Sequence, residues 1–276
     1  RQRQMCIRDR ASGDIKSSKG ASVFFGICFI VLLVIHVVLM LWKQSWHMLW
    51  LIIGTILELS AFFSNNAGNG VQSVQVIIAP IFIAASVYFS FSGLLKKLEI
   101  PKIGFNRRFQ SFLFIIGDII SFGLQIAGVV LQMIEDDKSL GQGLIITGFI
   151  VQIVSFCCFF TLVIAGHRKV NRMPLQSIMK GYYSWRTYFK VLYVLALLFF
   201  IRNIFRLVEY AQGYGGYIFN HAVYAYIFDA APMLIVCILL VIVHPGFVYA
   251  KVQKFMMEPR GDQEDDIVDK SSIEMA

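Results

Sequence analysis

Long apolar runs are the feature that most constrains the fold of this chain. Seven of them follow one another, and each is close to the roughly 20 residues that an α-helix needs to cross a lipid bilayer. The strands of a membrane barrel would instead alternate apolar and polar residues over segments of about ten, which is not the pattern here. The sequence therefore predicts an all-α membrane protein, a seven-transmembrane helix bundle. The predicted spans are 21–42, 47–63, 71–95, 109–134, 144–165, 187–210 and 224–243.

Composition agrees with a membrane bundle. Hydrophobic residues make up 57% of the 276 residues and charged residues 15%, whereas soluble domains have about 25% charged residues. The spans take up most of the chain, so we expect no soluble catalytic domain. No Gly-rich phosphate loop, His-Glu-x-x-His motif or nucleophile elbow occurs. We therefore expect no enzyme, no cofactor, no metal site and no nucleic-acid partner, and no ATP-driven transport by this chain alone.

Positive charge alternates between successive loops. The loops 96–108 and 167–186 each carry five Lys or Arg residues, whereas the loops 64–70 and 211–223 carry none. Basic residues concentrate in the cytoplasmic loops of membrane proteins. This pattern predicts the N-terminus outside and the C-terminus in the cytoplasm.

Three parts of the chain are expected. Residues 1–20 form a basic N-terminal extension, and its opening resembles translated adapter sequence, so it is left out of the fold prediction. Residues 21–250 form the seven-helix transmembrane domain. Residues 251–276 are rich in Asp and Glu and are expected to be a disordered, acidic cytoplasmic tail.

The sixth span carries formal charges inside an apolar run. Arg202, Arg206 and Glu209 fall within an arc of about 60° on a helix, so they share one face. A charge facing lipid costs from about 3 to over 10 kcal/mol unless it pairs or meets water. Asp229 begins the seventh span at the same predicted depth, so we expect the four side chains to form one cluster in the outer half of the membrane. The cluster is either a structural set of ion pairs or a site for a ligand or lipid headgroup, and three charges on one face favour the second.

Other polar residues interrupt the second, fourth and fifth spans. Asp118 and Gln125 lie one heptad apart on one face of the fourth span. Gln152 is expected to form a hydrogen bond between helices. For Asp118 and for Glu58 of the second span, a polar route through the membrane and a structural role remain open alternatives. His36, alone in the first span, is expected to be a packing residue.

The charged stretch also carries a family resemblance. Ile201-Arg-Asn-Ile-Phe-Arg-Leu-Val-Glu-Tyr-Ala-Gln-Gly213 resembles the signature of the RTA1-like family, fungal seven-span proteins also called lipid-translocating exporters. The resemblance covers roughly residues 21–250. Ala222 departs from the family's usual Glu, and Asn65 from its usual Arg. Further similar segments are Ala79-Pro80, Asp118-Ile-Ile-Ser-Phe-Gly-Leu-Gln125, Gly148 with Gln152, Tyr226-Ile-Phe-Asp229 and His244-Pro-Gly246.

The resemblance implies a multi-pass protein of a fungal plasma membrane, or of an endomembrane. Its partners would be membrane lipids, and its expected function is the translocation or export of sphingoid long-chain bases or toxic amphiphiles, with a link to stress response and drug resistance. The alternative is a receptor-like seven-span sensor of lipid or membrane stress that moves no substrate. The candidate substrate-binding residues are Arg202, Arg206, Glu209, Asp229, Asp118, Gln125 and Glu58.

Overall fold

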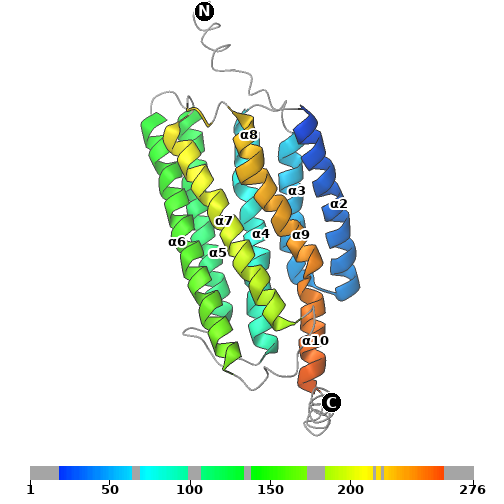
Figure 1. Ribbon diagram of the computed structural model, residues 1–276. Coiled ribbons are helices and arrows are strands. Elements are labelled where there is room, and N and C mark those ends of the chain that lie inside the picture. The colour runs from blue at the N-terminus through cyan, green and yellow to red at the C-terminus, as the bar shows by residue number, and fades with distance from the viewer. Residues whose placement is uncertain are drawn as a thin grey trace, which may run out of the picture.

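The computed structural model describes residues 19–63, 69–98, 107–133, 138–172, 184–213, 216–218 and 221–257. Within these ranges all regular elements are helical (Figure 1). Seven helical stretches are long and apolar enough to cross a membrane, which confirms the all-α seven-span prediction: Gly20–Lys43, Trp46–Phe63, Val74–Lys97, Phe114–Gln132, Ser139–Asn171, Trp185–Gln212 and Ala222–Lys254. Asn65, most of the predicted extension and most of the predicted acidic tail lie outside the described residues.

Successive membrane spans run in opposite directions and pack side by side, and α9 (Ala231–Ile242) also packs against α2 (Lys19–Lys43), which links the two ends of the series (Figure 1). The start of α2 and the end of α10 lie at opposite ends of the bundle. The elements are α2 (Lys19–Lys43), η1 (Trp46–Met48), α3 (Leu49–Phe63), α4 (Asn69–Lys97), α5 (Arg107–Met133), α6 (Lys138–Asn171), α7 (Trp185–Gln212), α8 (Ala222–Ala225), η4 (Tyr226–Ala230), α9 (Ala231–Ile242) and α10 (Pro245–Met257).

The outer surface and the interior are both apolar, as a bundle in lipid requires. Val34, Ile119, Val154 and Leu197 are among the large apolar side chains that are more than half exposed on the outside of the bundle. Because lipid tails are as apolar as these side chains, the outer surface gains nothing by being buried, and the helices must associate through close packing and polar contacts. The positions where helices touch therefore carry the specificity of the fold.

The α5–α6 pair shows this close packing most clearly. A Cβ added at Gly128 would lie 2.5 Å from the Gly141 carbonyl oxygen, and one added at Gly148 would lie 2.7 Å from the Ser121 carbonyl oxygen. Only glycine lets the two backbones approach this closely. The Gln125 amide also donates to Gln152 Oε1 across the pair, at 3.2 Å, which confirms the predicted hydrogen bond between helices.

The last span is not a single regular helix. It begins as α8, continues through the π-helical turn η4 and then through α9 to a break at Val243. After this break α10 runs on to Met257, with Val248 and Val252 buried against the bundle. The boundary predicted at residue 250 falls inside α10.

Candidate functional site

Five charged side chains from three helical segments meet inside the bundle, and we call them the charged cluster. Most of them are almost fully enclosed: the exposed fraction is 3% for Glu58, 1% for Arg202, 6% for Glu209 and 5% for Asp229. The members are Glu58 from α3, Arg202, Arg206 and Glu209 from α7, and Asp229 from η4.

Ion pairs link the four members that were predicted to meet. Arg202 Nε lies 2.7 Å from Asp229 Oδ1, and Arg206 Nη1 lies 2.8 Å from Glu209 Oε2. Arg206 Nη2 pairs with the second Asp229 oxygen, so this carboxylate bridges both guanidinium groups. The predicted pairing is confirmed, and the side chains face the protein interior rather than lipid. Such pairing is the arrangement that makes buried charges tolerable.

Proline places the second acceptor for Arg202. Arg202 Nη2 donates to the backbone carbonyl of Val76 in α4, at 2.7 Å. In a regular helix this carbonyl would accept from the N–H of residue 80, four positions later. Residue 80 is Pro80, which lies inside α4 and has no N–H. The proline therefore leaves this carbonyl without its helical donor, and the guanidinium supplies one.

A second proline shapes the segment that carries Asp229. Pro232, in the first turn of α9, cannot donate to the Phe228 carbonyl. Just before it the Ala231 N–H bonds to the Tyr226 carbonyl, five residues back, so the helix widens into the π-turn η4. Single π-turns are frequently found at functional sites. Pro232 is the residue in the sequence that could have indicated this turn.

Glu58 is the member that the sequence did not assign. It lies on α3 within electrostatic reach of Arg202, Arg206 and Asp229. Its Oε1 is buried and has no hydrogen-bond partner among the described residues. The same is true of the amide nitrogen of Asn203, which neighbours Arg202 on α7, is 1% exposed and was not among the candidates. The sequence signal that could have identified Asn203 is its polar amide, which follows Arg202 directly inside an apolar span.

Asp118 and Gln125 form a separate polar group. Asp118, on α5, lies beside the hydroxyls of Tyr88 in α4 and Ser155 in α6. Gln125 bonds to Gln152 and, at 3.5 Å, to Ser121. The structure thus divides the seven candidate residues into the charged cluster and this group between α4, α5 and α6.

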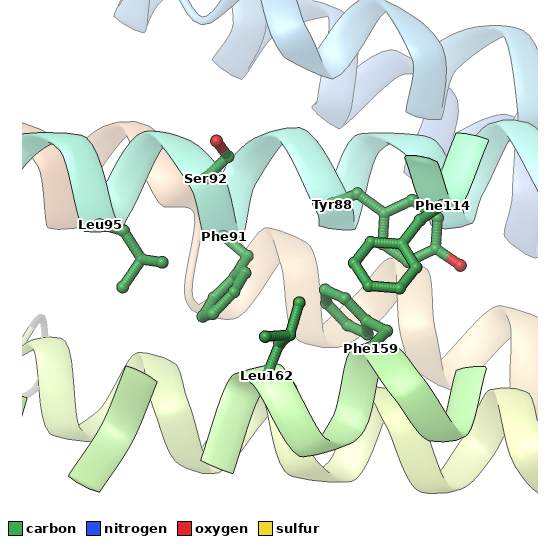
Figure 2. A pocket seen from close by; sticks show the side chains of 7 residues that line it. All are labelled: Tyr88, Phe91, Ser92, Leu95, Phe114, Phe159 and Leu162. Carbon is green, nitrogen blue, oxygen red and sulfur yellow. The ribbon is translucent and has the colours of Figure 1, made fainter. Parts of the chain in front are cut away.

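A small aromatic pocket adjoins the Asp118 group. Figure 2 shows Phe159 and Leu162 of α6 pointing toward Phe91 and Leu95 of α4. Tyr88, Ser92 and Phe114 complete the lining, and the space inside is about 10 Å³, enough for about one water molecule. This pocket cannot hold a lipid headgroup in the observed conformation.

Nothing in the described ranges suggests a metal centre. Among the residues that the structure describes, no group of three His, Cys, Asp or Glu side chains is placed to hold a metal ion. The charged cluster itself offers recognition of charge by paired guanidinium and carboxylate groups.

Seven apolar spans that enclose a charged cluster define an integral membrane protein of the helical-bundle class with a polar site inside its spans. The chain belongs to the RTA1-like family, because the family model described as "RTA1 like protein" matches residues 48–252. No solved structure matches.

Curated relatives come from Saccharomyces cerevisiae. Protoporphyrin uptake protein 1 is 36% identical over 171 residues, which are 61% of this chain and 55% of that protein. Protein RTA1 is 31% identical over 176 residues, 63% of this chain and 55% of that protein. The Sphingoid long-chain base transporter RSB1 is 27% identical over 271 residues, 79% of this chain and 69% of that protein. The chain thus spans about half the length of the first two relatives. Two of the three names describe transport and none describes an enzyme.

Proposed function

We propose that this protein translocates amphipathic lipids with a cationic headgroup, such as sphingoid long-chain bases, across a fungal membrane. The observation that carries the proposal is the charged cluster, in which buried carboxylates from α3, α7 and η4 meet inside the spans. Intramembrane ionisable residues commonly mark substrate pathways. The relative named as a sphingoid long-chain base transporter supports this substrate class.

The charges of the cluster favour a cationic headgroup over an anionic one. Both guanidinium groups already pair with carboxylates, so neither is free to bind an anion. The relative named for protoporphyrin uptake raises an anionic amphiphile as a second candidate, since protoporphyrin carries two carboxylates. An anion would have to break these ion pairs, whereas an ammonium group needs only a carboxylate oxygen.

Translocation requires a change of conformation, because the cluster is enclosed by the surrounding helices. The two prolines next to the cluster, Pro80 and Pro232, mark places where α4 and the last span lack a helical hydrogen bond. Helices interrupted in this way line the binding sites of many transporters. We propose that the α8–η4–α9 segment moves relative to α7 and opens the cluster to one leaflet.

The proposed function includes an orientation of the protein in the membrane and a cellular location. The alternating loop charges support an N-terminus outside and a C-terminus in the cytoplasm, and in that orientation the charged cluster would lie in the outer half of the membrane. A plasma-membrane location would allow long-chain bases or toxic amphiphiles to be exported, and this would link the protein to stress response and drug resistance.

Reconstitution in liposomes tests the proposal. We expect a fluorescent long-chain base to change leaflets faster with the protein than in empty liposomes, and an N-acylated, uncharged analogue to show no such acceleration. Equal rates with and without protein, with and without an imposed gradient, would contradict transport. Nucleotide exchange stimulated on added G proteins would then support the receptor-like alternative.

A variant of the cluster connects transport to the site. Glu209→Gln removes a carboxylate charge but leaves Arg206 paired with Asp229. We expect the translocation rate to fall roughly 10- to 150-fold, the equivalent of losing a charged hydrogen bond of about 1.5–3 kcal/mol. Thr147→Val is the matched control, because this exposed hydroxyl bonds only to its own helix, at Gly143 O. Equal loss in both variants would show that the charge of Glu209 is not the cause.

A further inference from the structure

The charged cluster holds more carboxylates than guanidinium groups. Its carboxylates are Glu58, Glu209 and Asp229, and its guanidinium groups are Arg202 and Arg206. If all five were ionised, three negative charges would face two positive ones, and one negative charge would remain. An uncompensated buried charge is so costly that the group takes up a proton or binds a counterion. The cluster therefore needs one extra positive charge to remain buried.

Geometry identifies the carboxyl group that carries the excess. Glu209 and Asp229 are held in ion pairs. Glu58 has no ion pair within the described part of the chain, its exposed fraction is 3%, and its Oε1 has no hydrogen-bond partner there. Glu58 is thus the acid that the cluster leaves uncompensated.

Among the residues that the structure describes, the surroundings of Glu58 show no other source of positive charge. The charged groups of α7 and η4 that interact electrostatically with Glu58 are Arg202, Arg206 and Asp229. Glu209 is held in its ion pair with Arg206. From α9 the neighbouring titratable group is the Cys237 thiol. On α2, the His36 ring is directed to the Cys237 carbonyl, at 3.2 Å, and Cys28 is a free cysteine. On α4, Lys96 and Lys97 lie in the last turn, far from Val76.

We propose that Glu58 exchanges a proton for the cationic headgroup, so that this protein is a proton-coupled exchanger of cationic amphiphiles. This inference rests on the proposed function and adds its energy source. The empty site holds Glu58 as the neutral acid. An arriving ammonium group displaces the proton, which leaves to water, and forms an ion pair with the Glu58 carboxylate. On the other side a proton from water converts the carboxylate back to the acid and releases the amine.

This cycle balances in atoms and in charge. One proton moves in one direction for each monovalent cation in the other, and no covalent bond to the lipid forms or breaks. The buried cluster has the same total charge in both loaded states, which keeps both compatible with a low-dielectric interior. The step needs no oxidant, nucleotide or metal ion.

Proton release on binding is the direct test, in detergent-solubilised full-length protein in weak buffer near neutral pH. An alkylamine stays protonated there, as the lysine side chain does with its pKa of about 10.4, so any released proton comes from the protein. Adding a long-chain base should release about one proton per amine bound, as the excess of one carboxylate requires. Its N-acylated analogue should release none.

Variants separate the assignment from a general effect. Glu58→Gln keeps the size and the neutral state but removes the carboxylate that would pair with the ammonium group, so we expect weaker amine binding and no proton release from any amine that does bind. Glu58→Asp should restore the release. Asp118→Asn is the discriminating second acid, because Asp118 lies in the separate group between α4, α5 and α6. Proton release that persists in Glu58→Gln, or that disappears only in Asp118→Asn, would overturn the assignment.

A transport measurement distinguishes this inference from the proposed function. A trimethylated, permanently charged long-chain base cannot cross as a neutral amine, so in liposomes its accumulation reports exchange alone. We expect a pH difference of about one unit to shift its distribution about tenfold toward the acidic side, the ratio equivalent to 1.36 kcal/mol. If long-chain bases are translocated but the distribution of the trimethylated base does not change with the pH difference, proton exchange is overturned and the proposed function is not. No translocation of any base would overturn the proposed function as well.

Discussion

At the scale of single residues, Arg202 shows how the bundle accommodates a charge inside its spans. Its guanidinium group has two acceptors from two different helical segments, the Asp229 carboxylate and the Val76 carbonyl. Val76 lies four residues before Pro80, and Asp229 lies three residues before Pro232. The arginine therefore joins α7, α4 and the last span at one point.

Breaking this buried ion pair from one side should be more damaging than removing both partners. Asp229→Leu leaves Arg202 without a carboxylate, and we expect a loss of about 3–5 kcal/mol in the free energy of unfolding. The double variant Arg202→Met with Asp229→Leu removes the unpaired charge while Arg206 keeps Glu209. It should recover most of the loss. Unfolding in mixed detergent micelles measures all variants, and additive losses would contradict the buried pair.

Sequence reasoning found the charges at this scale but not all of their partners. The spacing of Arg202, Arg206 and Glu209 fixed one helical face, and the rule that charges avoid lipid turned that face inward. The position of Asp229 followed from the depth of its span. The Val76 carbonyl could not be found in this way, because backbone acceptors have no signature in the sequence. Pro80 entered the sequence analysis only through the family resemblance, although a proline also frees the carbonyl four residues earlier.

At the scale of helical elements, glycine sets the distance between α5 and α6. Gly128 faces the Gly141 backbone, whereas Gly123, also on α5, has no atom within 4 Å of an added Cβ. The two positions lie on one helix and differ in whether a neighbouring backbone is close.

These two glycines form a matched pair for substitution. Gly128→Ala should lower the free energy of unfolding by about 1–3 kcal/mol, since its Cβ would be forced against a carbonyl oxygen that cannot retreat without separating the helices. Gly123→Ala should be neutral or stabilising by up to about 1 kcal/mol, because alanine favours the helix. Thermal unfolding in detergent compares them. Equal effects at both sites would show that the close approach of α5 and α6 is not what holds the pair.

The elements were easier to predict than their irregularities. The seven spans follow from run length alone, since only helices of this length can satisfy their own backbone across a bilayer. The π-turn η4 and the helix α10 did not follow. The first depends on how one proline is accommodated locally, and the second on an apolar face that follows a break at His244-Pro245.

At the scale of the whole molecule, the bundle keeps two polar groups apart. The charged cluster joins α3, α4, α7 and the last span, whereas the Asp118 group lies between α4, α5 and α6. Sequence alone placed both sets on helix faces but could not assign Glu58 to either, because one residue on one span does not reveal which neighbouring span it meets. The packing of α3 against α4 and α2, together with the position of η4, places Glu58 in the charged cluster.

The most direct test of the central claim, that the charged cluster receives the headgroup, is to map where a substrate attaches. A long-chain base with a photoreactive diazirine beside its amine would be cross-linked to the full-length protein in liposomes, and labelled peptides would be identified by mass spectrometry. We expect labels on α3, α7 and the α8–η4–α9 segment near Glu58, Arg202 and Asp229, removed by excess unlabelled base. Labels confined to α4, α5 and α6 around Asp118, or insensitive to competition, would contradict it.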